Sequence, residues 1–119
     1  MKKNIKAENL AENLTDIKDF IIQCLEDKKA EDIKVINCTS KTDIAEIMIF
    51  ATGRSVKNIS AIADYIGFEL KYKKNISVNI EGMNLSEWVL LDTGNIMLHL
   101  FNPESRQYFK LEEIWMEKT

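Results

Sequence analysis

The sequence predicts an α/β fold of the α+β type, in which helices pack on a mixed β-sheet within a single domain. Two apolar runs flank a short polar break at residues 92–95, which is typical of a β-hairpin. Two other stretches carry apolar residues at helical spacing. A last helix is indicated by the capping signal of residues 102–104. Taken along the chain, these signals predict the order αββαβββα.

The first predicted helix follows a polar segment. Residues 1–13 mix lysines with glutamates and lack an apolar core, so we expect a flexible N-terminal segment and a single domain over residues 14–119. Apolar residues then recur at three- and four-residue steps, as on one face of a helix. They are Leu14, Ile17, Ile21 and Leu25. The helix should end near Lys28 and Lys29, whose charges suit the negative end of the helix dipole.

Three segments predict strands before the hairpin. Residues 33–38 are rich in β-branched side chains, which favour a strand. Residues 44–51 are apolar on both faces apart from Glu46, as in a central strand that is covered on both sides. Residues 77–80 form a short third strand that leads through a turn into the hairpin.

Two more helices are predicted from caps and apolar stripes. Ser55 is the natural N-cap of the second helix. Its stripe consists of Ile59, Ile62, Ala63, Ile66 and Leu70. The last helix should start with Asn102 as N-cap and Pro103 at the first helical position. A final apolar stripe, expected to pack on the sheet, consists of Leu111, Ile114 and Trp115.

The hairpin should sort its side chains into two faces. We expect Thr93-Gly94 to be the two-residue loop, because Gly supplies the positive φ of such turns. In the register that follows from this loop, Trp88 faces His99. Successive strand residues alternate sides, and one face is then wholly apolar, formed by Val89, Leu91, Ile96, Leu98 and Leu100. The other, hereafter the mixed face, contains Trp88, Leu90, Asp92, Asn95, Met97, His99 and Phe101. Large apolar groups beside an acid, an amide and a histidine suit a surface that a partner covers.

Charge limits the class of partner. The chain has 119 residues with 45% hydrophobic content, enough for one domain with a core, and a formal net charge of -3. A binder held mainly by nucleic-acid phosphates normally shows a basic balance. The sequence therefore favours a basic protein partner.

Cysteines and hydropathy indicate an intracellular protein. Cys24 and Cys38 are isolated from each other and from His99, so they form neither a CxxC pair nor a zinc pattern, and we expect two buried thiols in a reducing cytoplasm. No apolar run approaches the roughly 20 residues of a membrane span. Since residues 1–13 lack the apolar core of a signal peptide, a cytoplasmic location without membrane contact is expected.

The candidates for chemistry each have a simpler structural interpretation. His99 stands without an obvious nucleophile, which favours an interface or hydrogen-bonded histidine over a catalytic base. Asp43 and Glu46 only loosely resemble a pair of metal carboxylates, and no metal or cofactor site is predicted. Residues 52–55 could cradle a phosphate at a helix N-terminus, although a plain tight strand-to-helix connection is favoured.

A short basic cluster ends the second helix. Lys71, Lys73 and Lys74 surround Tyr72, which most often marks a solvated cationic helix terminus. A minor contact with RNA backbone is the alternative.

Four segments carry a resemblance to a known family. Residues 49–55 (IFATGRS), 61–64 (AIAD), 87–92 (EWVLLD) and 99–104 (HLFNPE) together resemble the ribosomal silencing factor family, RsfS, also called Iojap-like. The resemblance covers residues 14–117 in the same order. One departure is the hairpin tip, Asp-Thr-Gly-Asn, where the family commonly has Asp-Tyr-Gly-Asp.

The resemblance implies a function without catalysis. A factor of this family docks on protein fourteen of the large ribosomal subunit and keeps the small subunit from joining, which represses translation. It also implies a fold related to nucleotidyltransferases without their active site. Carried over to this chain, the family's functional positions are Trp88, Asp92, Asn95 and His99, all of which belong to the mixed face. Leu90 and Met97 complete the expected partner-binding set.

Three hypotheses follow. The first is a ribosome-docking blocker, monomeric or homodimeric off the ribosome, with a minor ribosomal RNA contact near Lys71, Lys73 and Lys74. The second is a degenerate nucleotidyltransferase-like protein that binds nucleotide. The third is a small dimeric scaffold with no ribosomal role.

Overall fold

The computed structural model describes residues 7–39, 45–82 and 87–109. Their elements are α1 (Ala7–Asp27), β1 (Glu31–Asn37), β2 (Ile47–Thr52), α2 (Val56–Lys74), β3 (Asn79–Glu81), β4 (Trp88–Asp92), β5 (Ile96–Phe101) and α3 (Pro103–Phe109). The predicted order αββαβββα is confirmed. The stripe predicted at Leu111, Ile114 and Trp115 lies outside the described residues.

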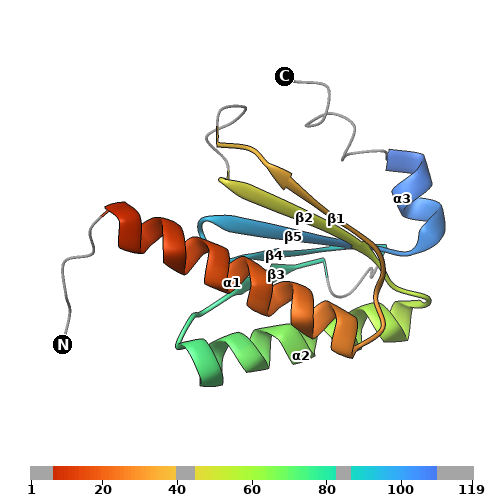
Figure 1. Cartoon of the computed structure of the whole chain (residues 1–119). Helices are drawn as coiled ribbons and strands as arrows, with labels where there is room; N and C mark the ends of the chain where they lie inside the picture. Colours follow the sequence, from red (N-terminus) through yellow and green to blue (C-terminus); the bar gives the residue numbers. More distant parts are fainter. Residues whose placement is uncertain (1–6, 40–44, 83–86, 110–119) are drawn as a thin grey trace.

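The strands form one sheet in the order β1-β2-β5-β4-β3. β2 and β5 run parallel, whereas the other neighbouring pairs are antiparallel, so the predicted mixed sheet is confirmed. Helices α1 and α2 lie side by side under one face of this sheet, and α3 stands beyond the end of β5 (Figure 1). None of the helices within the described residues is both long and apolar enough to cross a membrane.

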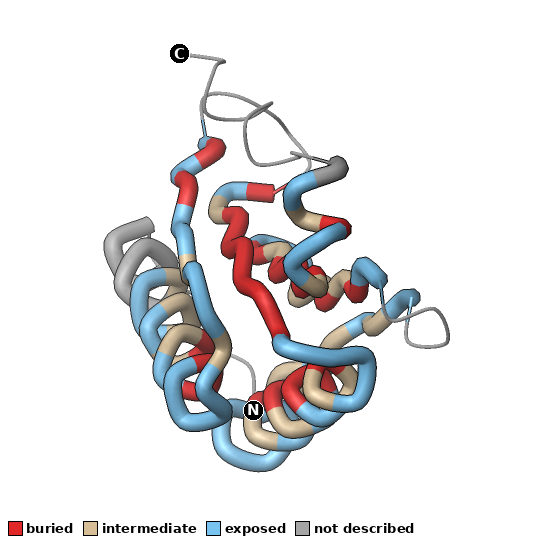
Figure 2. The backbone as a smooth tube through the Cα atoms, turned by 90° about the vertical axis from the view of Figure 1, so that its right-hand side faces the viewer, coloured by how far each residue is buried: buried red, intermediate tan, exposed pale blue. Residues whose placement is uncertain are grey.

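Buried residues lie on both faces of the sheet. The larger cluster fills the space between the two long helices and the sheet, with Leu25, Ile66 and Leu91 among its members. A smaller cluster on the opposite face includes Met48, Phe50 and Phe101. Figure 2 shows the buried positions gathered in the central strands and on the helix sides that face them. Because β2 contributes to both clusters, the prediction of a strand covered on both sides is confirmed.

Helix α1 is longer than predicted. It begins at Ala7, so residues 7–13 belong to this helix and the predicted start near Leu14 is wrong. These residues are mostly alanine, leucine and glutamate, which are strong helix formers. The helix ends at Asp27, close to the predicted point. There Lys29 adopts a positive φ of 62°, and Ala30 N donates to Leu25 O at 2.9 Å, as in a Schellman cap.

The hairpin register differs from the predicted one by two residues. Trp88 lies opposite Phe101 and Leu90 lies opposite His99, so the expected pairing of Trp88 with His99 is wrong. The central residues of the turn are Gly94 and Asn95, not Thr93 and Gly94. Both central residues of the expected turn would need positive φ, which a β-branched Thr disfavours. Because the shift is even, the residues of both strands keep their predicted faces, whereas Asn95 lies in the turn and on neither face.

Candidate functional site

The mixed face lies on the side of the sheet opposite α1 and α2. On β4 and β5 its cross-strand pairs are Trp88 with Phe101, Leu90 with His99, and Asp92 with Met97. The apolar face predicted for the hairpin is confirmed, because Val89, Leu91, Ile96, Leu98 and Leu100 are all buried in the larger cluster. The structure thus brings together five of the six predicted partner-binding residues. Asn95 lies apart, exposed in the turn.

On the mixed face, the solvent exposure of the side chains is much higher for Trp88 on β4 than for His99 on β5. Trp88 keeps 36% of its surface exposed, whereas His99 keeps 6%. Leu90, Asp92 and Met97 are half-buried. A partner approaching this face would therefore meet Trp88, Leu90 and Asp92 on β4 before it reached His99.

Trp88 is held by a hydrogen bond and by stacking. Its indole Nε1 donates to Nδ1 of His99 at 3.1 Å. The indole also stacks with Phe101, with ring centroids 5.7 Å apart and planes 20° apart. Aromatic side chains of this kind supply a large contact area at interfaces while their polar atom is satisfied.

His99 is a neutral histidine inside the sheet face. Its ring stacks on Phe50 of the neighbouring strand β2, with centroids 4.6 Å apart and planes 9° apart. Burial lowers the pKa of His99 to about 4, so the ring is uncharged near neutral pH. Since Nδ1 accepts the indole hydrogen, the ring proton must reside on Nε2. Nε2 is buried and has no hydrogen-bond partner within the described part of the chain.

The hairpin tip is organised by side chains that bond the backbone. Asp92 Oδ1 accepts a hydrogen bond from Gly94 N at 2.8 Å. The Thr93 hydroxyl accepts from Ile96 N at 3.1 Å and donates to Ile96 O at 3.2 Å. Thr93 stands where the resemblance leads us to expect a tyrosine, and it acts as a turn residue. The nearest aromatic side chain that this face presents is therefore Trp88, at the far end of β4.

Strand β3 adds two polar residues that sequence reasoning missed. Asn79 lies opposite Asp92, and Glu81 lies opposite Leu90, so both share the mixed face. They are exposed, and Asn79 Nδ2 donates to Glu81 Oε2 at 3.2 Å. The available signal was their alternation with the half-buried Ile80. Together with Asp92, Glu81 gives the outer edge of this face an acidic character.

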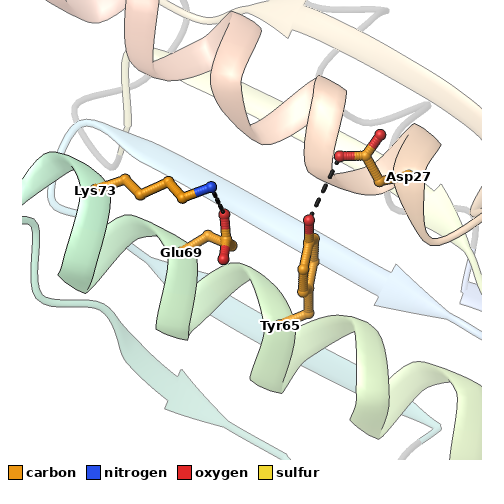
Figure 3. A network of polar contacts seen from close by, with 4 residues as sticks. All are labelled: Asp27, Tyr65, Glu69 and Lys73. Carbon is orange, nitrogen blue, oxygen red and sulfur yellow. Dashed lines mark hydrogen bonds and ion pairs between the residues drawn. The ribbon is translucent and has the colours of Figure 1, made fainter.

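The predicted basic cluster lies at the end of α2, on the far side of the sheet from the mixed face. Lys73 pairs with Glu69 at 2.9 Å, and Tyr65 of α2 donates to Asp27 of α1 at 3.4 Å; both contacts are drawn in Figure 3. The hydrogen bond with Glu69 raises the pKa of Lys73. Lys74 lies 5.1 Å from the ring centroid of Phe20, over its face. Two of the three lysines therefore have contacts within the protein.

The connection from β2 to α2 is filled by its own side chains. Asn58 N donates to the N-cap Ser55 Oγ at 3.1 Å, and Asn58 Oδ1 accepts from Arg54 N at 2.9 Å. A Cβ on Gly53 would lie 2.5 Å from Cγ1 of Ile59. Two of the backbone donors near this helix start, Arg54 N and Asn58 N, are thus used within the connection, which favours the plain tight connection.

The remaining candidates for chemistry are structurally separate. Cys24 and Cys38 are buried free thiols, as predicted, and burial raises the pKa of Cys24 to about 11. Residues 7–39, 45–82 and 87–109 contain no cluster of three histidine, cysteine or acidic residues that could hold a metal. Asp43, one of the two carboxylates considered from the sequence, lies outside these ranges, and Glu46 is exposed.

Comparison with known proteins identifies relatives along nearly the whole chain. A family model described as "Ribosomal silencing factor during starvation" matches residues 11–119. A ribosomal silencing factor RsfS from Zymomonas mobilis is 37% identical over 96 residues, which cover 81% of this chain and 72% of that protein. A mouse protein named "Mitochondrial assembly of ribosomal large subunit protein 1" is 29% identical over 100 residues, covering 82% of this chain and 44% of the mouse protein.

The fold is likewise similar to a solved structure. A crystal structure of a protein from Chromobacterium violaceum superposes with a TM-score of 0.83 at 31% identity, covering 88% of each chain. The family match begins within α1, at residue 11, and runs to residue 119, so it includes the whole sheet and the mixed face. The chain belongs to the ribosomal silencing factor family, a family of regulatory proteins that act on the ribosome.

Proposed function

We propose that this protein docks through its mixed face on protein fourteen of the large ribosomal subunit and sterically blocks the small subunit from joining. The observation that carries the proposal is the partly exposed Trp88 indole, hydrogen-bonded to His99 on a sheet face with an acidic edge. The family match and the large-subunit role in the name of the mouse relative support a large-subunit partner. A cytoplasmic site of action is part of the same proposal.

Charge and surface chemistry agree with a protein partner of basic character. Asp92 and Glu81 lie beside the apolar groups Trp88 and Leu90, and the chain carries a net charge of -3. Acidic groups around an apolar patch contribute orientation and association rate toward a basic partner, while buried aromatic anchors contribute most of the affinity. A ribosomal protein exposed on the subunit surface fits this description.

The proposal is tested by cosedimentation of purified large subunits with wild type and the Trp88→Ala variant. Removal of an aromatic anchor should weaken binding by about 2 kcal/mol, or about 30-fold in Kd. Val56→Ala is the control, because Val56 is 52% exposed at the start of α2, away from the mixed face and from the lysines at the other end of this helix. If both variants bind like wild type while remaining folded, docking does not use the mixed face.

We also propose a minor contact with ribosomal RNA at the C-terminal end of α2. Lys71 is exposed there, whereas Lys73 and Lys74 are engaged with Glu69 and Phe20. A single phosphate contact contributes about one counterion to the salt dependence of binding. The Lys71→Ala variant should therefore show a slightly smaller salt slope than wild type, and an unchanged slope would remove this contact from the proposal.

A further inference from the structure

We propose that His99 is a positioning residue that fixes the Trp88 indole in the orientation required for docking, and does not itself touch the partner. The inference deepens the proposed function and rests on it for the docking step. It starts from the contact between these two side chains, in which Trp88 Nε1 donates to His99 Nδ1 at 3.1 Å.

The contact crosses the hairpin diagonally. The direct cross-strand partner of Trp88 is Phe101, and that of His99 is Leu90, so the two side chains reach toward each other across adjacent pairs. Their ring centroids are 6.0 Å apart, and their planes are 23° apart. The hydrogen bond thus adds to the Phe101 stack in favouring one orientation of the partly exposed indole, and loss of the acceptor should weaken that preference.

The imidazole is itself held in place from two sides. Phe50 on β2 stacks against it with ring centroids 4.6 Å apart. Phe101, on the same strand as His99, has a ring plane nearly parallel to that of the imidazole, with 7° between the planes and centroids 6.3 Å apart. Phe50 and Phe101 are fully buried. The acceptor atom therefore stands on a rigid support, which is what a positioning residue needs.

Packing alone does not explain a histidine at this position. A phenylalanine ring could stack on Phe50 in the same plane, and it would avoid the buried Nε2, which has no hydrogen-bond partner within the described residues. An unsatisfied buried donor is unfavourable. The property that histidine has and phenylalanine lacks is the Nδ1 acceptor, and that acceptor is used by Trp88.

The low exposure of His99 separates its role from that of Trp88. At 6% exposure the imidazole offers almost no surface to a partner, whereas Trp88 offers 36% of its own. An anchor that is already held in its bound orientation loses less freedom on association. Loss of the acceptor should therefore weaken docking through Trp88.

The test uses two variants whose side chains have the same number of heavy atoms and the same branching, His99→Asn and His99→Leu. Asparagine carries an oxygen near the place of Nδ1 and can accept the indole hydrogen, whereas leucine cannot. A third variant, His99→Phe, keeps the stack on Phe50 and also lacks the acceptor, so it guards against a folding defect in His99→Leu. Thermal melting of each purified variant confirms that it is folded before binding is measured.

The first measurement is the indole N–H resonance of Trp88 in isolated protein, recorded in a Trp115→Phe background that leaves one tryptophan. We expect the indole hydrogen to exchange slowly with water in wild type and His99→Asn. In His99→Leu and His99→Phe it should exchange fast. An unchanged resonance in all variants would overturn the proposal, because the indole would then not depend on His99.

The second measurement is Kd for purified large subunits. We expect His99→Leu and His99→Phe to bind about five- to tenfold more weakly than wild type, and His99→Asn to bind within about twofold of wild type. Equal binding by folded acceptor and non-acceptor variants would overturn the positioning role while leaving the proposed function in place. Absence of binding by wild type would instead overturn the proposed function and the docking role of His99 with it.

Discussion

Leu91 and Leu98 lie directly opposite each other across the β4–β5 hairpin, and both are 1% exposed against the two long helices. The next pair toward the turn, Asp92 and Met97, lies on the other face and is half-buried. Neighbouring residues of one strand therefore serve different purposes: one set stabilises the fold, and the other forms the surface proposed for docking.

This alternation predicts opposite phenotypes for two adjacent leucines. Leu91→Ala should lower the free energy of unfolding by about 2–5 kcal/mol, because it leaves a cavity in the core. Leu90→Ala, the matched control, should cost less stability, since Leu90 is half-buried, and should weaken binding to large subunits. Urea denaturation and cosedimentation measure the two effects. A larger loss of stability for Leu90→Ala would show that the face assignment is inverted.

Asp92 is expected to have two separable roles. Asp92→Asn removes the charge but keeps an oxygen that can accept from Gly94 N, so its melting temperature should stay close to that of wild type. Asp92→Lys removes both the negative charge and the oxygen acceptor for Gly94 N, and it should lower the free energy of unfolding by about 1 kcal/mol. Both variants should bind large subunits more weakly, and the loss should shrink as salt is raised. Salt-independent loss in both would argue against an electrostatic contribution.

Two glycines with positive φ should differ in their tolerance of alanine. Gly82, at φ 89°, has no room for a side chain, because a Cβ would lie 2.4 Å from the carbonyl oxygen of Trp88. Gly94, at φ 106°, has nothing within 4 Å of its Cβ position. Gly94→Ala should therefore cost only the backbone strain of about 1–3 kcal/mol. Gly82→Ala should cost more and should also displace Trp88, so that docking falls; equal melting temperatures would contradict this.

The buried His99 should make stability depend on pH in a defined window. Its pKa is about 4 in the folded protein, below the ordinary value of 6.5, because burial disfavours the charged ring. The unfolded chain therefore binds more protons between these values, and stability is lost as pH falls from 6.5 toward 4, by about 3 kcal/mol at most. His99→Phe should remove this part of the pH dependence. Thermal melts of both proteins at pH 7 and pH 4.5 measure the difference.

The sequence predicted the faces of the hairpin more securely than its register. Alternation placed Leu91 and Leu98 in the core and Trp88 on the opposite face. These assignments hold because a register shift of two residues leaves each strand residue on the same face. The predicted turn is wrong because Gly94 can be either the first or the second central residue of a two-residue turn, and the glycine alone does not distinguish the two. The β-branched Thr93 was the available signal.

The burial of His99 could not be predicted from the hairpin alone. It results from Phe50, which reaches it through the parallel pairing of β2 with β5, two strands separated by a helix and two other strands in sequence. Asn79 and Glu81 are a different case, since they join the mixed face through pairing with β4, the next strand in sequence, and their alternation with Ile80 was the available signal. Contacts between distant strands depend on sheet order, which periodicity does not specify.

Steric blocking of subunit joining is tested most directly by a joining assay with purified small and large subunits. As the protein is titrated, the yield of joined ribosomes should fall in proportion to the fraction of large subunits occupied. It should recover when excess isolated protein fourteen is added, without any nucleotide. Trp88→Ala should require about 30-fold more protein for the same effect. Inhibition by trace amounts, persistence after dilution, or a requirement for ATP would contradict steric blocking and favour the nucleotide-binding alternative.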